Sequence, residues 1–377
     1  MGEKIRIRFF INTLGGGGAE KVLVELLKQL NPDRYDVALV VVSGGTHSTE
    51  IPKFVNYREI TACPIPWLQA IYKKVVYKMP KRLFARLYMQ GEFDIEIAFL
   101  EGFPTHVLAG METTAKKAAF IHCDVSVTGI MNSIYPSVQK CVDEYSAFDR
   151  VCFVSNGAKR GFENVIGPLE NAVVIHNVLD TKTILNRSTE ETEFHYKTDG
   201  MRIISVGRLT RPKRYDRLID IASLLQKKYN FEIWIVGEGE ERVSLEKQIA
   251  DLGVTTVRLL GFHNNPYSLL RQADLFVCSS DFEGYSTAVT EAVALGLPVL
   301  TTDCAGMDEI LNNGEYGMIV KNNCDSLRKG LERILSDKAY YYLLKERANK
   351  GSSFQKMNGI CEYEDLFANL LGMALYD

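Results

Sequence analysis

The sequence predicts an α/β protein built from two doubly wound domains. Short β-branched runs alternate along the chain with amphipathic stretches of helical length, which is typical of parallel sheets covered by helices. The chain has 377 residues, more than a single hydrophobic core usually serves. The alternation lapses once, at residues 179–200, where the sequence is polar and lacks apolar periodicity. We therefore expect one domain on each side of this lapse.

The predicted strands fall into two series. The first comprises residues 5–11, 35–42, 94–100, 116–122 and 150–155, and the second comprises residues 202–206, 231–236, 256–260, 275–278, 298–301 and 318–320. These series predict Rossmann-like domains at residues 1–180 and 201–354, joined by a linker at 181–200, with residues 355–377 packing back onto the first domain. Doubly wound sheets bind ligands beyond the carboxyl ends of their strands. The expected site is a cleft between the two domains.

Composition excludes several classes of protein. The chain is 46% hydrophobic and 24% charged with a net charge of −3, which excludes a disordered chain and argues against a nucleic-acid partner. Apolar runs are shorter than the roughly 18 residues of a membrane span, and the start of the chain lacks a signal-peptide pattern. The eight cysteines form no CxxC pair. They indicate reduced thiols of a cytoplasmic protein, without a zinc site or disulfide framework.

The segment at residues 279–298, SSDFEGYSTAVTEAVALGLP, is the most informative part of the chain. It follows an apolar strand and leads into a predicted helix, with Glu283 in the preceding loop and Glu291 about one turn inside. Gly284 permits a close approach of the backbone, and an anion or a hydroxyl-rich ligand is favoured at such a helix start by the amides of Tyr285, Ser286 and Thr287. Two carboxylates suit the hydroxyls of a sugar and a ribose. The alternative is an ordinary exposed helix start.

This segment resembles the signature of the retaining family-4 glycosyltransferases with the GT-B fold, in which two glutamates are separated by seven residues. The resemblance continues in GLPVLTTDCAGMDEIL and, upstream, in VGRLTRPKRYDRLI, VGEGEERVSLE and LLGFHNNP. Over residues 202–320 these motifs occur in the family's order and approximate spacing. The amino-terminal half agrees more loosely, through GGGGAEKVL, IHCD, FVSNGAKRGF and IHNVLD.

The resemblance implies roles for residues of the second domain. Arg208 and Lys213 match a basic pair that contacts the donor diphosphate, where fixed cations stabilise the charge of the leaving group. Glu283 is implied to hold donor-sugar hydroxyls and Glu291 the ribose, with the amides of residues 284–287 close by. The loops that flank the base are implied to contain Glu238, Gly261, Phe262 and His263. Without the resemblance, Arg208 and Lys213 would be read as surface charges.

The first domain contributes weaker candidates. Gly16 and Gly17 lie in a glycine run between a strand and a helix, where bare backbone can approach a diphosphate, although a plain tight turn is the alternative. His122 ends a predicted strand and resembles a family histidine near the reacting sugar, although a structural histidine is the alternative. Asp124 is a candidate on the acceptor side.

The implied reaction transfers a hexose from a nucleotide-diphosphate sugar to an acceptor hydroxyl with retention of configuration. Glu283, His122, Arg208 and Lys213 are the catalytic candidates. The sequence contains no Asp-x-Asp motif, so we expect no metal and no cofactor beyond the nucleotide sugar, for which UDP is favoured. The alternatives are a GT-B epimerase or phosphorylase, or a non-catalytic nucleotide-sugar-binding protein.

Residues 67–90 carry six Lys or Arg residues and no acid, interleaved with aromatic and aliphatic residues. Such a stretch suits an anionic membrane surface, and the alternative is a basic solvated helix face interrupted at Pro80. We therefore expect a saccharide or lipid-linked saccharide acceptor, a role in cell-surface polysaccharide or glycolipid synthesis, and peripheral attachment to the inner face of the cell membrane.

Overall fold

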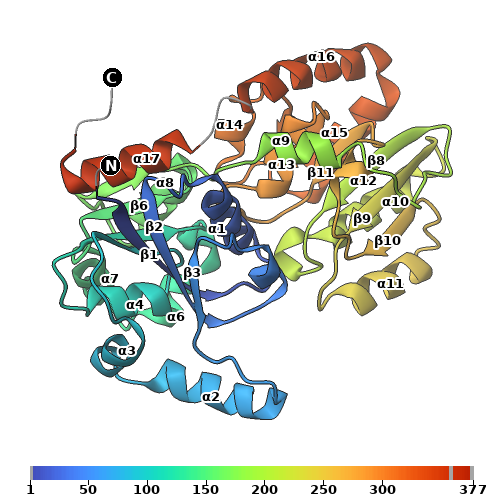
Figure 1. Cartoon of the computed structure of the whole chain (residues 1–377). Coiled ribbons are helices and arrows are strands. Elements are labelled where there is room, and N and C mark those ends of the chain that lie inside the picture. Colours follow the sequence, from blue (N-terminus) through green and yellow to red (C-terminus); the bar gives the residue numbers. More distant parts are fainter. Residues whose placement is uncertain (1–2, 356–359, 374–377) are drawn as a thin grey trace. The chain divides into compact units, whose positions relative to one another are not determined.

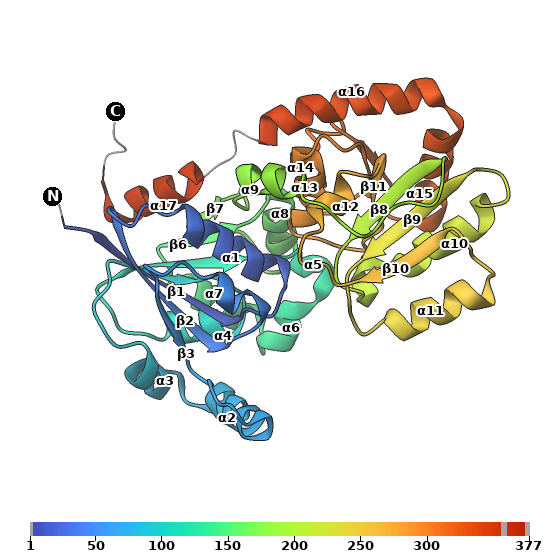
Figure 2. The same ribbon diagram turned by 45° about the vertical axis from the view of Figure 1, so that its right-hand side comes forward.

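The computed structural model describes residues 3–355 and 360–373. The chain divides into two compact units (Figures 1 and 2). The first unit comprises Met1–Val178 and Gly359–Asp377, and the second comprises Leu179–Asn358. Each unit has a parallel sheet with its own hydrophobic core, which confirms the predicted fold class.

The first unit is built on a seven-stranded sheet in the order β3-β2-β1-β4-β5-β6-β7, as far as the structure describes it. Its strands are β1 (Ile5–Thr13), β2 (Tyr35–Ser43), β3 (Asn56–Glu59), β4 (Ile95–Ala98), β5 (Lys116–Ile121), β6 (Arg150–Phe153) and β7 (Ala172–Val174). The helical segments are α1 (Gly18–Gln29), η1 (Thr46–Glu50), α2 (Pro66–Lys78), α3 (Lys81–Tyr88), α4 (Phe103–Ala109), α5 (Val125–Thr128), α6 (Ile130–Ile134), α7 (Val138–Tyr145), α8 (Asn156–Val165) and α17 (Cys361–Leu371).

The two faces of this sheet are covered by different helices, because alternate residues of a strand point to opposite faces. Phe9 belongs to the core that also contains the buried side chains of α1 and α17. Phe10, the next residue, stacks on Phe84 of α3 at a centroid distance of 5.4 Å. Burial on both faces explains the apolar run Phe9–Ile11 of β1, whereas the buried Arg8 of this strand is ion-paired with Glu96 of β4.

Helix α17 returns to the first unit from the far end of the chain. The ring of Phe367 packs edge-on against Tyr35 at 5.8 Å, and the ring of Tyr363 stacks on Phe120 at 5.7 Å. Each buried aromatic side chain contributes about 1.5–3 kcal/mol. The predicted return of residues 355–377 is observed for α17, whereas residues 356–359 and 374–377 lie outside the described part of the chain.

The second unit is built on a six-stranded sheet in the order β10-β9-β8-β11-β12-β13 within the described residues. Its strands are β8 (Met201–Val206), β9 (Phe231–Val236), β10 (Val257–Gly261), β11 (Leu275–Cys278), β12 (Val299–Thr302) and β13 (Met318–Val320). The helical segments are α9 (Thr181–Arg187), η2 (Arg211–Lys213), α10 (Tyr215–Leu225), α11 (Arg242–Asp251), α12 (Tyr267–Leu270), α13 (Thr287–Ala294), α14 (Met307–Ile310), α15 (Cys324–Ser336) and α16 (Lys338–Gln355).

The structure departs from the predicted elements in three places. Strand β3 escaped prediction because its sequence, NYRE, lacks an apolar pattern, and strand β7, the apolar AVV, because it has only three residues. Residues 181–200 are more than a linker, since they begin with helix α9 and belong to the second unit. There the ring of Tyr196 stacks on Trp234 at 3.7 Å, a long-range contact that local polarity concealed.

Candidate active site

The donor-side candidates gather where the strand order of the second sheet reverses. β8 is the first strand of this unit, with β9 and β10 on one side and β11 on the other. The loops that leave β8 and β11 therefore diverge, which opens the carboxyl edge of the sheet to ligands. Lys213 lies on η2 after β8, and Glu283 lies in the loop after β11. Sequence motifs 70 residues apart thus meet at one edge.

Lys213 and Glu283 form a direct ion pair. The Lys213 ammonium donates to Oε1 of Glu283 at 2.7 Å, and the Ser280 hydroxyl donates to the same oxygen at 2.6 Å. The side chains are 28% and 11% exposed, respectively. Both hydrogen bonds end on Oε1, so Oε2 can accept a ligand hydroxyl, and the ammonium has two further N–H groups for anionic oxygens.

The ionisation of Lys213 follows from this contact. Burial by itself lowers the pKa of a lysine, but the Glu283 carboxylate outweighs burial and raises the pKa of Lys213 above its ordinary value. The lysine is therefore positively charged throughout the physiological range. A fixed positive charge at this edge suits a diphosphate leaving group.

Two further hydrogen bonds hold the loops of the pair in place. The Ser279 hydroxyl donates to the backbone carbonyl of Lys213 at 2.8 Å, and the Asp281 N–H donates to the carbonyl of Pro212 at 2.7 Å. The carboxylate of Asp281 is ion-paired with Arg214 at 3.1 Å. Sequence analysis did not predict roles for Ser279 and Ser280, which stand directly after β11.

The loops after β8, β9 and β10 pack too closely for side chains at several glycines. A Cβ atom on Gly237 would lie 1.9 Å from the Gly207 carbonyl oxygen, and the φ angle of Gly237 is +148°. Gly261, at a φ of +81°, lies against Glu238, where a Cβ atom would be 2.9 Å from Oε1 of the carboxylate. Gly261 thereby lies beside Glu238, and their shared role in base binding stays a prediction.

Helix α13 begins at Thr287, as the motif predicts, with Ser286 at its N-cap position. Gly284, Tyr285 and Ser286 are buried, and Gly306 packs against this turn, where a Cβ atom would lie 2.6 Å from the Gly284 carbonyl oxygen. Glu291, one turn inside the helix, is buried. Burial of an acidic side chain is costly without a polar function or partner, so the ordinary exposed helix face is not what the structure shows.

The remaining donor-side candidates are less enclosed. Arg208 is exposed directly after β8, and Phe262 is exposed directly after β10. The ring of His263 packs edge-on against Phe194 at 4.7 Å. These positions leave Arg208 and Phe262 accessible to a ligand, while His263 is partly committed to packing.

The corresponding edge of the first sheet carries the amino-terminal candidates. Its strand order reverses between β1 and β4. The glycine run follows β1, and its φ of +92° at Gly16 is a conformation that favours glycine. Gly17 is the N-cap residue of α1, whose first turn contains Glu20. The glycines are therefore positioned where a backbone amide can face a ligand.

Glu101 is a candidate that sequence analysis missed, although it directly follows the predicted strand at residues 94–100. Its Oε2 accepts the backbone N–H of His122 at 3.2 Å, and its Oε1 accepts the Cys123 thiol at 3.3 Å. Burial raises the pKa of Glu101, while these hydrogen bonds oppose the rise. An acid next to a buried strand was the available signal, and its contacts fix the backbone at His122.

His122 is half-buried, and its imidazole is neutral at pH 7. Its ring packs against Phe99 at a centroid distance of 4.9 Å, and its Nε2 atom is buried without a hydrogen-bond partner in the described residues. Burial lowers the pKa of His122 to about 4, against a smaller opposing effect of a hydrogen bond to the backbone of Phe99. If the Nδ1 proton makes that hydrogen bond, Nε2 is an acceptor. Such a nitrogen can accept a hydrogen bond, although the atom is buried in this structure.

We expect His122 to make the stability of the protein depend on pH. Its folded-state pKa of about 4 lies below the ordinary value of 6.5, so the unfolded chain takes up this proton first as the pH falls. The contribution of His122 to the free energy of unfolding is complete above about pH 6.5 and is lost as the pH falls towards 4. Its upper limit is about 3 kcal/mol. Chemical unfolding of wild type and His122→Phe between pH 7 and 4.5 measures this loss. The free energy of unfolding of wild type should fall relative to that of the variant as the pH decreases.

The exposed His195 supplies the control for that experiment. His195→Gln should follow the wild-type pH dependence throughout the range. A constant difference between wild type and His122→Phe would contradict the burial of a neutral imidazole at position 122.

Asp124 has a local structural role. Its Oδ1 accepts the backbone N–H of Ser126 at 2.9 Å, which caps the short helix α5. Gly161 of α8 lies against the same carboxylate, where a Cβ atom would be 2.0 Å from Oδ1. An acceptor-side role for Asp124 stays a prediction.

Neither a cluster of potential metal ligands nor a membrane-spanning helix is found in the described residues. No group of three or more His, Cys, Asp or Glu side chains in residues 3–355 and 360–373 is arranged to hold a metal ion. Within the same residues, no helix is long and apolar enough to cross a membrane. All eight cysteines are free thiols.

Comparison with known proteins finds relatives among the glycosyltransferases. Residues 186–351 match the family model described as Glycosyl transferases group 1. The chain is 27% identical over 358 residues to N-acetylgalactosamine-N,N'-diacetylbacillosaminyl-diphospho-undecaprenol 4-alpha-N-acetylgalactosaminyltransferase of Campylobacter jejuni, covering 91% of this chain and 94% of that protein. It is 30% identical over 190 residues to the O-antigen biosynthesis glycosyltransferase WbnH of Escherichia coli, covering 50% of this chain and 51% of that protein.

The fold has close counterparts among solved structures. The Anabaena Alr3699/HepE structure in complex with UDP and glucose has a TM-score of 0.74 at 19% identity, covering 98% of this chain and 100% of that chain. The lipopolysaccharide-biosynthesis glycosyltransferase WaaG has a TM-score of 0.67 at 14% identity, covering 97% and 100%. Two parallel-sheet units of this kind define the GT-B class of glycosyltransferase folds.

Residues 186–351, which make up most of the second unit and include Lys213 and Glu283, match the glycosyl transferases group 1 model. Together with the named relatives, this match supports a glycosyltransferase, as the motifs predict. The narrower assignment to the retaining family 4 stays a prediction.

Proposed function

We propose that this protein is a retaining, metal-independent hexosyltransferase that uses a UDP-sugar and acts on a lipid-linked saccharide in cell-surface polysaccharide synthesis. The Lys213–Glu283 ion pair at the carboxyl edge of the second sheet is the observation that carries the proposal. It combines a positive charge for the diphosphate with a carboxylate for sugar hydroxyls, within the family domain.

Each group has a defined task in this proposal. Lys213 and Arg208 stabilise the negative charge that develops on the departing nucleotide diphosphate. Glu283 orients the donor sugar through its hydroxyls, and Glu291 holds the ribose. His122 contacts the donor sugar as the neutral imidazole described above. The acceptor proton passes to an oxygen of the leaving phosphate, so no dedicated protein base is required.

Release of UDP tests the proposed reaction. With a UDP-sugar donor, free UDP should appear only when a lipid-linked saccharide is supplied, and the rate should persist in excess EDTA. A panel of nucleotide sugars screened by thermal shift identifies the donor beforehand, because a ligand that binds only the native state raises the melting temperature.

The possible results separate the alternatives. Binding of a nucleotide sugar without turnover would identify a passive binding protein, and interconversion of the donor sugar without UDP release would identify an epimerase. Dependence on a divalent cation would contradict the metal-independent mechanism.

The relatives support the choice of acceptor and donor. The name of the Campylobacter relative specifies a diphospho-undecaprenol-linked saccharide, and that of WbnH specifies O-antigen biosynthesis. HepE has been crystallised with UDP-glucose. The lipid-linked acceptor brings the enzyme to a membrane, and nucleotide sugars place the reaction on the cytoplasmic face.

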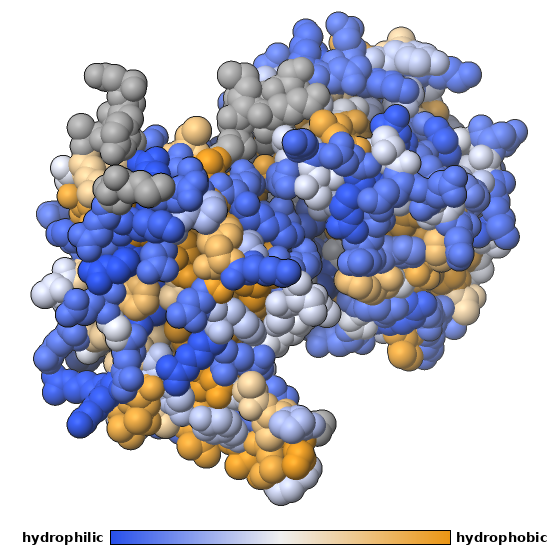
Figure 3. Space-filling view, in the orientation of Figure 1, coloured by the Kyte–Doolittle hydropathy of each residue, from blue (hydrophilic) through white to orange (hydrophobic). Residues whose placement is uncertain are grey.

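Helices α2 and α3 supply a surface that suits this location. Pro80 separates them, as predicted, and Figure 3 shows hydrophobic side chains over α2 at the lower end of the view. The exposed apolar residues are Trp67, Leu68, Ile71, Tyr72, Val75, Leu83 and Leu87. With six Lys or Arg residues and no acid in residues 67–90, this α2–α3 surface fits the head-group region of an anionic membrane.

Trp67 provides a direct probe of membrane attachment. It is 64% exposed, whereas Trp234, the only other tryptophan of the sequence, is 1% exposed. Anionic vesicles at low salt should shift the tryptophan emission to the blue, and high salt should reverse the shift because it screens charge. Trp67→Phe is the control and should show no shift. Absence of binding at low salt would contradict the proposal.

A further inference from the structure

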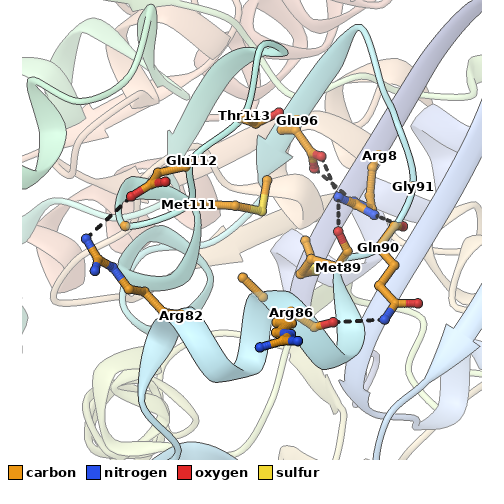
Figure 4. Close-up of a pocket in the computed structure, with 12 residues that line it drawn as sticks. Arg8, Arg82, Arg86, Met89, Gln90, Gly91, Glu96, Met111, Glu112 and Thr113 are labelled. Carbon is orange, nitrogen blue, oxygen red and sulfur yellow. Dashed lines mark hydrogen bonds and ion pairs between the residues drawn. The ribbon is translucent and has the colours of Figure 1, made fainter.

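A cavity of about 580 Å³ opens in the first unit beside α3 (Figure 4). It is lined by α3, by residues 110–113 between α4 and β5, and by Arg8 of β1 with Glu96 of β4. Its volume falls in the range of small-ligand sites. None of its described lining residues is a donor-site candidate.

The floor of the cavity is a buried ion pair between Arg8 and Glu96, whose charged groups are already paired within the protein. Arg8 donates from Nε to Oε2 of Glu96 at 2.9 Å, and it donates from its terminal nitrogens to the carbonyls of Met89 at 2.8 Å and Gln90 at 2.7 Å. These contacts fasten the end of α3 to the sheet. Arg8 is therefore a structural residue, and its charge is already neutralised by Glu96.

At the rim of the cavity, in contrast to the floor, two arginine side chains are available to a ligand. Arg82 and Arg86 lie one turn apart on α3 and both line the cavity. Arg82 contacts Glu112 at 3.4 Å, but these side chains are 87% and 89% exposed, and such pairs open readily. Among the described residues, no ion pair is formed by the exposed Arg86. The rim thus presents two guanidinium groups against one loosely held carboxylate.

Apolar residues adjoin this arginine pair along the sequence of α3. Leu83 and Leu87 each follow an arginine by one position, and both are exposed. They belong to the α2–α3 surface defined above. A ligand that suits both features has a phosphate at the cavity and hydrocarbon beside it. Guanidinium groups favour phosphate, because their fork geometry allows two parallel hydrogen bonds to its oxygens.

We propose that this cavity binds the phosphate of an anionic phospholipid head group, with Arg82 and Arg86 on the phosphate oxygens and Leu83 and Leu87 among the acyl chains. The inference rests on the proposed membrane attachment and adds a selectivity for phosphate over other anionic groups. It does not depend on sugar transfer.

The test compares two double variants that remove the same charge at the same spacing. Arg82→Gln/Arg86→Gln changes the rim of the cavity, and Lys74→Gln/Lys78→Gln changes two exposed residues of α2 that do not line it. Binding is measured by sedimentation with vesicles of digalactosyldiacylglycerol that contain either phosphatidylglycerol or oleate, at matched surface charge.

Wild type should prefer phosphatidylglycerol to oleate by about tenfold, the scale of a charge-assisted hydrogen bond. Each double variant should bind the vesicles up to about 30-fold more weakly than wild type, because all four basic residues contribute similarly to the affinity for an anionic surface. The preference should disappear in Arg82→Gln/Arg86→Gln and persist in Lys74→Gln/Lys78→Gln. Equal preference in all three proteins would overturn the proposal.

Soluble glycerol phosphate separates a lipid head group from free phosphate. Millimolar glycerol phosphate should leave vesicle binding unchanged, and displacement of the protein would reassign the cavity to a soluble phosphate ester. Melting curves of all three proteins report folding. A UDP-induced thermal shift reports the donor site separately, so failure of the proposed enzyme function is distinguishable from failure of the lipid site.

Discussion

Lys213→Ala should lower the rate of sugar transfer by about 100-fold to 1000-fold, the cost of removing one fixed group that stabilises developing negative charge. Glu283→Gln should cause a loss of similar size, because the amide replaces the charge that orients both Lys213 and the donor sugar. UDP release in the presence of acceptor measures the rate. Since the two side chains form one ion pair, the double variant should lose less than the product of the single losses.

The stability of these variants should change little compared with their activity. The pair is partly exposed to solvent, so breaking it should cost about 1–2 kcal/mol, less than a fully buried pair would. Chemical unfolding measures this change alongside the transfer rate.

The matched control is the pair between Lys228 and Glu332 in the same unit. Its N–O distance is also 2.7 Å, with side-chain exposures of 64% and 27%. Lys228→Ala should leave transfer unchanged. The assignment of the active site would be contradicted by wild-type rates of sugar transfer in all three variants, Lys213→Ala, Glu283→Gln and Arg208→Ala.

Gly237→Ala should destabilise the second unit by about 3–5 kcal/mol. The added Cβ atom would lie 1.9 Å from the Gly207 carbonyl oxygen, and the φ of +148° is unfavourable for alanine. Differential scanning calorimetry should show the melting temperature of this unit falling by roughly 10 °C. Because Gly207 precedes Arg208, any relief of the clash displaces the loop to which we assign the diphosphate, and UDP affinity should fall as well.

Gly253→Ala is the control for backbone strain without a clash. Gly253 also has a positive φ, +59°, but an added Cβ atom there meets nothing within 4 Å. We expect a cost of about 1–2 kcal/mol and unchanged UDP affinity. Equal effects of the two substitutions would show that the packing against Gly207 does not control stability.

The placement of the donor-side candidates in the fold was largely predictable because their motifs are local. The strand at residues 275–278, the glycine turn and the start of α13 follow one another in a single segment, so hydrophobic pattern and helix-start chemistry were sufficient to locate Glu283 and Glu291. All six strands of the second unit were predicted for the same reason, since each is an apolar run bounded by polar loops. The edge strands of the first unit were missed, because β3 is polar and β7 has only three residues.

The sequence by itself determined the alternation of strands and helices, the two series of elements and the chemical types at the donor motif, because these depend on neighbours along the chain. Only the tertiary structure decided that Ser280 shares an oxygen of Glu283 with Lys213, that Glu101 fixes the backbone at His122, and that Arg82 and Arg86 border a cavity. Those relations join residues from separate strands and helices. Their distances are set by sheet order and packing, which no local pattern encodes.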